Sequence, residues 1–163
     1  MFEQLEGVTQ VVSGYAGGAA DAANYQAVSA GLTEHAEAIR ITYDPQKISF
    51  EKLLEVFFTV AHDPTQLNRQ GPDTGRQYRS AVFYATDDEK RIVEDYIRKL
   101  EAEKVYDKPI VTTLERLTQF HPAEDNHQDY VRLNPAQPYV VYNAQPKVAK
   151  VRKKYADQVR ETR

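Results

Sequence analysis

One short run of the sequence, His35-Ala36-Glu37, places a carboxyl group where it could act as an acid. The run leads into an alternating stretch whose apolar face holds Ile39, Ile41 and Tyr43, a pattern typical of a half-buried strand. Because successive strand residues point to opposite faces, Glu37 shares that face if the strand already includes it. Burial would then raise the pKa of its carboxyl and favour a group that donates a proton or binds an oxygen atom. The alternative is a strand that begins later and leaves Glu37 in water.

Two other polar runs have residue types that bind metals or activate nucleophiles. Residues 121–127 contain four metal-binding side chains: His121, Glu124, Asp125 and His127. Their spacing matches neither the helical two-histidine zinc motif nor a calcium loop, so we expect no bound metal and a hydrogen-bonded turn instead. The pair His62-Asp63 has no serine in a nucleophile elbow beside it, and adjacent residues rarely present their side chains together. A hydrolase triad therefore has weak support.

Tyrosine is the main source of neutral hydroxyl donors, with eleven residues in the chain. Most are expected to pack with one polar tip in water. Tyr25 and Tyr78 differ from the rest because they lie in or beside the two longest loops. The residues alone thus indicate a soluble α/β domain with a polar site lined by tyrosine and glutamate.

Composition excludes several classes of chemistry. The 163 residues contain no cysteine, which excludes disulfides, thiolate zinc sites, iron–sulfur ligation and a thiol nucleophile within these residues. The net charge of −3 gives no general reason to expect a nucleic-acid partner. The first residues are acidic rather than signal-like, and no run approaches the roughly 18 apolar residues that span a membrane. We therefore expect a cytoplasmic protein that binds neither membrane nor nucleic acid.

The elements that must position these residues can be read in order along the chain. Strands are predicted at 8–12, 38–43, 80–84 and 110–114, and helices at 49–60, capped by Ser49, and behind the capping box Thr86-Asp87-Asp88-Glu89. Loops at 14–24 and 62–78 separate them, and loops of this length are where a site is expected. This order predicts a single α+β domain over residues 1–163, built as a two-layer α/β sandwich.

The C-terminal segment, about residues 147–163, is predicted to form a basic helix. It contains seven Lys or Arg against two Asp or Glu. One interpretation is a patch for nucleic acid or an anionic membrane. We favour a solvated helix that packs through Val148, Val151 and Tyr155, because the rest of the chain is acidic and no aromatic residues are interleaved for stacking on bases.

Several stretches, taken together and in order, closely resemble the A-type peptide methionine sulfoxide reductase family. The most specific are Gly14-Tyr15-Ala16-Gly17-Gly18, Tyr25-Gln26-Ala27-Val28-Ser29-Ala30-Gly31, His35-Ala36-Glu37, His62-Asp63-Pro64-Thr65-Gln66 and Gln77-Tyr78-Arg79-Ser80-Ala81. The similarity covers nearly the whole chain. It implies a ferredoxin-like mixed sheet with long loops.

The resemblance also implies an activity and a set of site residues. In this family a cysteine thiolate attacks the sulfur of methionine-S-sulfoxide, free or in proteins, and a thiol reductant, usually thioredoxin, clears the resulting sulfenic acid. Glu37 matches the family's glutamate that protonates or hydrogen-bonds the sulfoxide oxygen. Tyr25 and Tyr78 match its oxygen-binding tyrosines, and Asp73 matches its loop aspartate. No cofactor is implied, and we expect a monomer that interacts with thioredoxin and oxidised proteins.

The sequence departs from the family at its sulfur chemistry. The family's Gly-Cys-Phe-Trp motif, with the first strand before it, has no counterpart here, and Val140 stands where many relatives have a second cysteine. We therefore expect the chain as given to be inactive. Three interpretations follow: a chain that starts at an internal methionine of an active reductase, a catalytically dead module that binds methionine sulfoxide, or a gene fragment.

Overall fold

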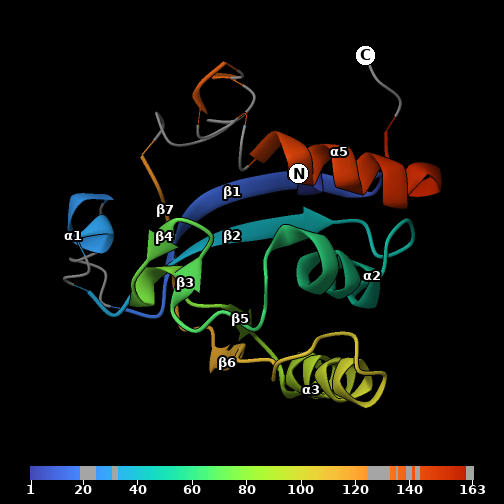
Figure 1. Ribbon diagram of the computed structural model, residues 1–163, viewed down its shortest axis with the longest axis horizontal. Helices are drawn as coiled ribbons and strands as arrows, with labels where there is room; N and C mark the ends of the chain where they lie inside the picture. Colours follow the sequence, from blue (N-terminus) through green and yellow to red (C-terminus); the bar gives the residue numbers. More distant parts are fainter. Residues whose placement is uncertain are drawn as a thin grey trace.

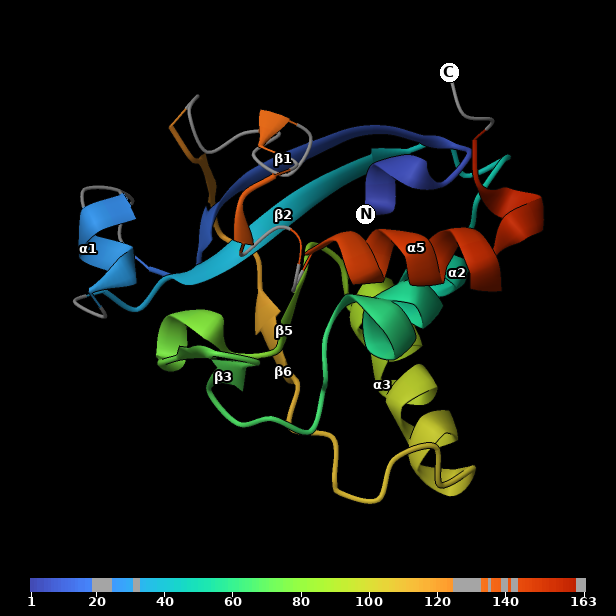
Figure 2. The same ribbon diagram turned by 45° about the horizontal axis from the view of Figure 1, so that its top comes forward.

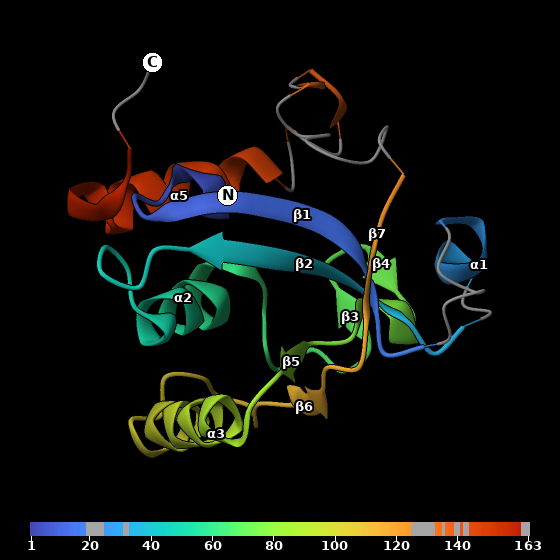
Figure 3. The same cartoon turned by 180° about the vertical axis from the view of Figure 1, so that it is seen from behind.

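The computed structural model describes residues 1–18, 25–30, 33–124, 133–134, 136–138, 141 and 144–160. A three-stranded antiparallel sheet has β1 (Val8–Ala16) at its centre, between β2 (Ala36–Tyr43) and β7 (Phe120–Pro122). A second sheet pairs β5 (Ala81–Tyr84) in parallel with β6 (Thr113–Arg116). Figures 1 and 3 show β5 and β6 on the far side of β2 from β1.

The α+β class predicted from the sequence is confirmed. Parallel and antiparallel pairing both occur, as expected of a mixed sheet, but among the described residues they lie in separate sheets. β2 and β5 are therefore edge strands whose outer edges have no strand partner in the described part of the chain.

The predicted loop 62–78 contains short elements of its own. They are β3 (Arg69–Gln70), β4 (Asp73–Thr74) and a 3₁₀ helix (Arg76–Tyr78). β3 and β4 pair as an antiparallel hairpin, and Gly75, at φ +139°, reverses the chain after it. Gly75 also donates its N–H to the Asn68 carbonyl at 2.9 Å, which closes the hairpin. The segment expected to be a loop is thus held in a defined shape.

Three helices support these sheets. α2 (Phe50–Val56) continues as a π-helix over Phe57–Ala61, and α3 (Asp87–Ala102) links β5 to β6. α5 (Gln145–Lys154) lies beside α2, as Figure 2 shows. None of the helices in the described ranges is long and apolar enough to cross a membrane.

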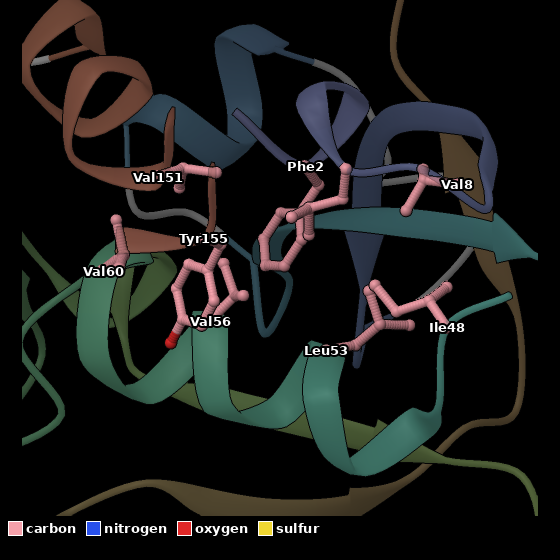
Figure 4. Close-up of a cluster of buried hydrophobic side chains, with 9 residues drawn as sticks. Phe2, Val8, Ile48, Leu53, Val56, Val60, Val151 and Tyr155 are labelled. Atoms are coloured by element: carbon pink, nitrogen blue, oxygen red, sulfur yellow. The ribbon is translucent and has the colours of Figure 1, made fainter. Parts of the chain in front are cut away.

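Two groups of buried side chains form the core. The first joins α2 and α5 to the N-terminal residues and the start of β1, and its members meet in Figure 4: Phe2, Leu5, Val8, Ile48, Leu53, Val56, Val60, Val151 and Tyr155. The second joins α2 to α3 through Leu54, Phe58, Val93 and Leu100. Val151 of α5 and Tyr155, which follows α5, are both buried in this core, so the basic helix packs through an apolar face. α5 ends at Lys154, so the helix predicted over residues 147–163 is shorter than expected.

Ser49 forms the helix cap predicted from the sequence. Its hydroxyl accepts a hydrogen bond from the Lys52 N–H at 3.0 Å, satisfying one of the free donors at the start of α2. We expect Ser49→Ala to lower the free energy of unfolding by about 1 kcal/mol in urea titrations. Ser49→Asp keeps an acceptor at this position and should leave stability nearly unchanged, so equal losses in both variants would contradict the capping role.

Candidate functional site

A cavity of about 1090 Å³ is lined by residues from β1, β2, β5 and α2. Residues 13–16 of β1, 36–41 of β2 and 81–83 of β5 lie on its wall, with Ser80 just before β5. Because β1 is the central strand of its sheet, the cavity is not confined to the free edges of β2 and β5. Three of the residues predicted to form the site, Glu37, Asp73 and Tyr78, lie in its wall.

Glu37 belongs to β2, as the first interpretation expects, but its side chain is exposed rather than buried, as the alternative expects. The strand begins at Ala36, so Glu37 is already part of the paired sheet, and Tyr15 of β1 is its partner. Solvent reaches its side chain through the cavity. The surrounding protein still removes enough water to raise the pKa of the Glu37 carboxyl, and the nearby negative charge of Asp73 raises it further.

The β3–β4 hairpin and the 3₁₀ helix after it place Asp73 and Tyr78 on the cavity wall. Asp73 pairs with Gln70 across the hairpin. The Tyr78 N–H donates to the Gly75 carbonyl at 3.0 Å, which fixes the turn that ends at Tyr78. Gly75 has a φ of +139°, which other residues rarely adopt, so this turn needs glycine for its backbone conformation. Glu37, Asp73 and Tyr78 thus reach one cavity from separate segments.

Tyr25 and part of the run 121–127 cannot be placed in the same way. Tyr25 is the first residue of α1 (Tyr25–Ser29), and its side chain lies outside the described structure. Asp125 and His127 also lie outside the described residues. The described part of the run does not form the expected turn, because His121 and Pro122 belong to β7 and pair with β1. Glu124, just beyond β7, accepts a hydrogen bond from the Tyr15 hydroxyl at 3.2 Å.

His35 does not share the cavity with Glu37. Its side chain is fully buried at the end of β1, where Nδ1 accepts the Gly18 N–H at 3.1 Å and the ring packs edge-on against His121. The Nε2 atom of His121 is buried without a hydrogen-bond partner among the described residues. Within those residues, no three metal-binding side chains gather.

His62 pairs with a residue that the sequence did not single out. Its Nδ1 donates to the Phe57 carbonyl at 2.8 Å, which leaves Nε2 to accept the Ser80 hydroxyl at 2.6 Å. Ser80 in turn accepts from Thr112 at 2.7 Å. Burial lowers the pKa of His62 to about 4, so the ring is neutral near pH 7. Asp63 instead accepts from Thr65. No Ser–His–Asp triad forms, because a backbone carbonyl occupies the position of the acid.

These observations describe an α+β protein with Glu37, Asp73 and Tyr78 on the wall of one cavity. A carboxyl with a raised pKa and a tyrosine are both on its wall, and hydrogen-bond donors at such a point stabilise a developing oxyanion. The sequence contains no thiol that could supply electrons.

Residues 1–159 match the sequence model of the family described as "Peptide methionine sulfoxide reductase", and the chain belongs to this family. It is 53% identical over 152 residues to peptide methionine sulfoxide reductase MsrA 2 of Mesorhizobium japonicum, covering 93% of this chain and 78% of that one. It is 49% identical over 160 residues to MsrA 2 of Synechocystis sp., covering 98% and 75%.

Solved structures agree in fold. The reduced form of Mxr1 from Saccharomyces cerevisiae superposes with a TM-score of 0.75 at 31% identity, covering 81% of this chain and 75% of that one. Methionine sulfoxide reductase A of Corynebacterium diphtheriae gives a TM-score of 0.66 at 37% identity, covering 80% and 66%. The family resemblance expected from the sequence is therefore confirmed.

Proposed function

We propose that this chain binds methionine-S-sulfoxide, free or within oxidised proteins, and presents it to a catalytic cysteine thiol, which these residues do not contain. The observation behind this proposal is the placement of Glu37, Asp73 and Tyr78 on one cavity wall, with the pKa of Glu37 raised. A sulfoxide oxygen gains negative charge when a thiolate attacks the sulfur. A protonated Glu37 would give that oxygen a proton, and the Tyr78 hydroxyl would donate a hydrogen bond to it.

Asp73 and Tyr25 have supporting roles in this proposal. The negative charge of Asp73 helps to keep Glu37 protonated, since a second negative charge close by is unfavourable. Tyr25 is proposed as a second hydroxyl donor on the strength of the family resemblance alone. The whole chain, residues 1–163, is proposed to act as one domain, because the family match extends through residue 159.

The electrons for the reaction come from outside these residues. Reduction of a sulfoxide by two thiols gives a thioether, a disulfide and water, and both thiols are missing from this sequence. We propose that thioredoxin regenerates a catalytic cysteine that these residues do not contain, so thioredoxin alone does not reduce a sulfoxide bound to them. We also propose no prosthetic cofactor, a monomeric state and a cytoplasmic location. A binding module without turnover is the second candidate, which the absence of cysteine favours directly.

Calorimetric titration of N-acetyl-methionine-S-sulfoxide methylamide into the chain tests the binding step. We expect saturable one-to-one binding, and binding of the matching methionine amide weaker by about tenfold, because methionine lacks the oxygen that accepts hydrogen bonds. Affinity for the sulfoxide should fall as the pH rises through the raised pKa of Glu37, since the ionised carboxylate no longer donates.

Two variants make this test specific. Glu37→Ala should weaken sulfoxide binding by about tenfold because one donor is lost. Glu34→Gln is the matched control, since its carboxyl lies three residues away, is 66% exposed and pairs only with Arg76 in the described structure. A folded chain with no saturable sulfoxide binding at pH 5 would overturn the proposed function.

A further inference from the structure

Arg79, which lines the cavity beside Tyr78, has a side chain held by four hydrogen bonds in the described structure. It is only 6% exposed. Its Nε and Nη2 atoms each donate to Glu115 at 3.0 Å, which makes a two-point ion pair. Nη2 also donates to the backbone carbonyl of Glu34 at 3.1 Å, and Nη1 donates to that of Arg76 at 3.2 Å. Four of the hydrogen bonds that a guanidinium group can donate are therefore in use.

The acceptors of Arg79 lie on the segments that hold the site residues. Glu34 precedes Glu37 by three residues, at the entry to β2. Arg76 begins the 3₁₀ helix that ends at Tyr78. Glu115 lies on β6, the partner strand of β5. One side chain thus connects the segment of Glu37 to the segment of Tyr78 and fixes both to the second sheet.

Gly17 shows how closely the chain packs on this group. Its φ is +99°, and a Cβ there would lie 2.8 Å from Nη2 of Arg79. The end of β1 therefore rests on the guanidinium, and only glycine fits this contact. The ion pair with Glu115 also neutralises the positive charge of the Arg79 guanidinium group. Burial acts to raise the pKa of Glu115, but hydrogen bonds from Arg79 and Thr113 outweigh it and hold that pKa below its ordinary value.

We propose that Arg79 is a positioning residue that sets the separation between Glu37 and Tyr78, so that one sulfoxide oxygen reaches both. The proposal rests on the function proposed above. Lysine cannot replace arginine in this role, since an ammonium group is a point charge without the planar fork that bonds a carboxylate at two points while reaching two further carbonyls.

The test compares Arg79→Lys with Arg76→Lys. Arg76 lies in the same 3₁₀ helix and has the same charge, but its side chain is 60% exposed and pairs only with the side chain of Glu34 among the described residues. For Arg79→Lys we expect the Kd for N-acetyl-methionine-S-sulfoxide methylamide to rise about tenfold at unchanged stoichiometry. For Arg76→Lys it should change by less than about twofold.

Hydrogen–deuterium exchange supplies a readout that does not depend on ligand. In Arg79→Lys the amides of residues 34–37 and 76–79 should exchange at least about fivefold faster, while those of α3 remain protected. Glu115→Gln, which keeps one acceptor oxygen, should show the same pattern more weakly. It also serves as the second variant if Arg79→Lys does not fold.

The possible outcomes are distinct. A merely structural role would lower the stoichiometry and the melting temperature and leave Kd unchanged, which would overturn the proposal, as would unchanged local exchange. If exchange rises locally but even the unmodified chain does not bind the sulfoxide, the proposed function fails. The positioning role in sulfoxide binding then fails with it, and Arg79 remains only a link between segments.

Discussion

The 163-residue chain is expected to give no turnover of methionine-S-sulfoxide, with either dithiothreitol or thioredoxin as reductant. Glu37 and Tyr78 can polarise the bond between sulfur and oxygen, but neither can supply two electrons, and the sequence has no cysteine that forms a covalent intermediate. Chromatographic quantification of methionine measures this directly. Thiol-dependent methionine formation at rates above those of the reductant alone would show that a thiol in the chain is not needed.

A chimera that contains the missing cysteine is the variant expected to be active. This chain covers 78% of the Mesorhizobium japonicum relative, so that relative has residues beyond the match. By the family resemblance, its N-terminal segment should contain the Gly-Cys-Phe-Trp motif. Joining that segment ahead of Met1 is expected to produce turnover, and a Cys→Ser version of the chimera should not. Equal rates in both chimeras would show that this cysteine is not the nucleophile.

The second large expected effect is a loss of stability on acidification caused by His62. The pKa of His62 is about 4 in the folded chain against 6.5 in an unfolded one, because the ring is buried. Between these values the unfolded chain binds a proton that the folded chain does not bind, so unfolding becomes easier as pH falls. One pKa unit corresponds to about 1.4 kcal/mol, which gives a loss of about 3 kcal/mol between pH 6.5 and 4.

Asp and Glu carboxyl groups also titrate in the lower part of the range from pH 6.5 to 4. A variant is therefore needed to separate the contribution of His62 from theirs. His62→Gln keeps a polar amide near the Phe57 carbonyl and the Ser80 hydroxyl but does not titrate. Urea titrations from pH 7 to 4 should show the wild-type chain losing about 3 kcal/mol more than this variant. Parallel stability curves would mean that His62 does not account for the loss.

Features that depend on neighbouring residues in the sequence could be predicted. Ser49 and Thr86 accept the N–H bonds that their positions indicated, and period-two alternation located β2. Features that depend on contacts between residues far apart in the sequence could not be predicted. The strand predicted at 110–114 begins instead at Thr113, because the Val111 N–H donates to the Pro64 carbonyl of a loop rather than to β5.

Gly14 is the clearest wrong prediction. It was expected to end the first strand, but β1 continues to Ala16. A Cβ on Gly14 would collide with the His121 carbonyl and the Phe120 ring of β7, so this glycine marks a close approach of two strands. β7 itself has three residues and exists only by pairing with β1, which no local pattern in the sequence indicates.

The candidate site was predictable in part. Residue types and the resemblance pointed to Glu37, Asp73 and Tyr78, and the structure brings these side chains to one cavity. The contacts of Arg79, and the hydrogen bond between His62 and Ser80, join residues 18 or more positions apart in the sequence, apart from the bond of Arg79 to Arg76. A pattern confined to neighbouring residues cannot reveal such bonds.

The pairing of β1 with β2 predicts where the chain tolerates a change in length. The one irregularity lies between Val8 and Gln10, and pairing then proceeds without interruption to Ala16 opposite Ala36. Adding or deleting a single residue within 10–16 would turn the β1 side chains on one side of the change to the opposite face of the sheet and would disturb the pairing of Tyr15 with Glu37. The same change beside Thr9 would be absorbed by the existing bulge. Insertions and deletions in β1 should therefore be tolerated near Thr9 and should destabilise the sheet near Tyr15, which pairs with Glu37.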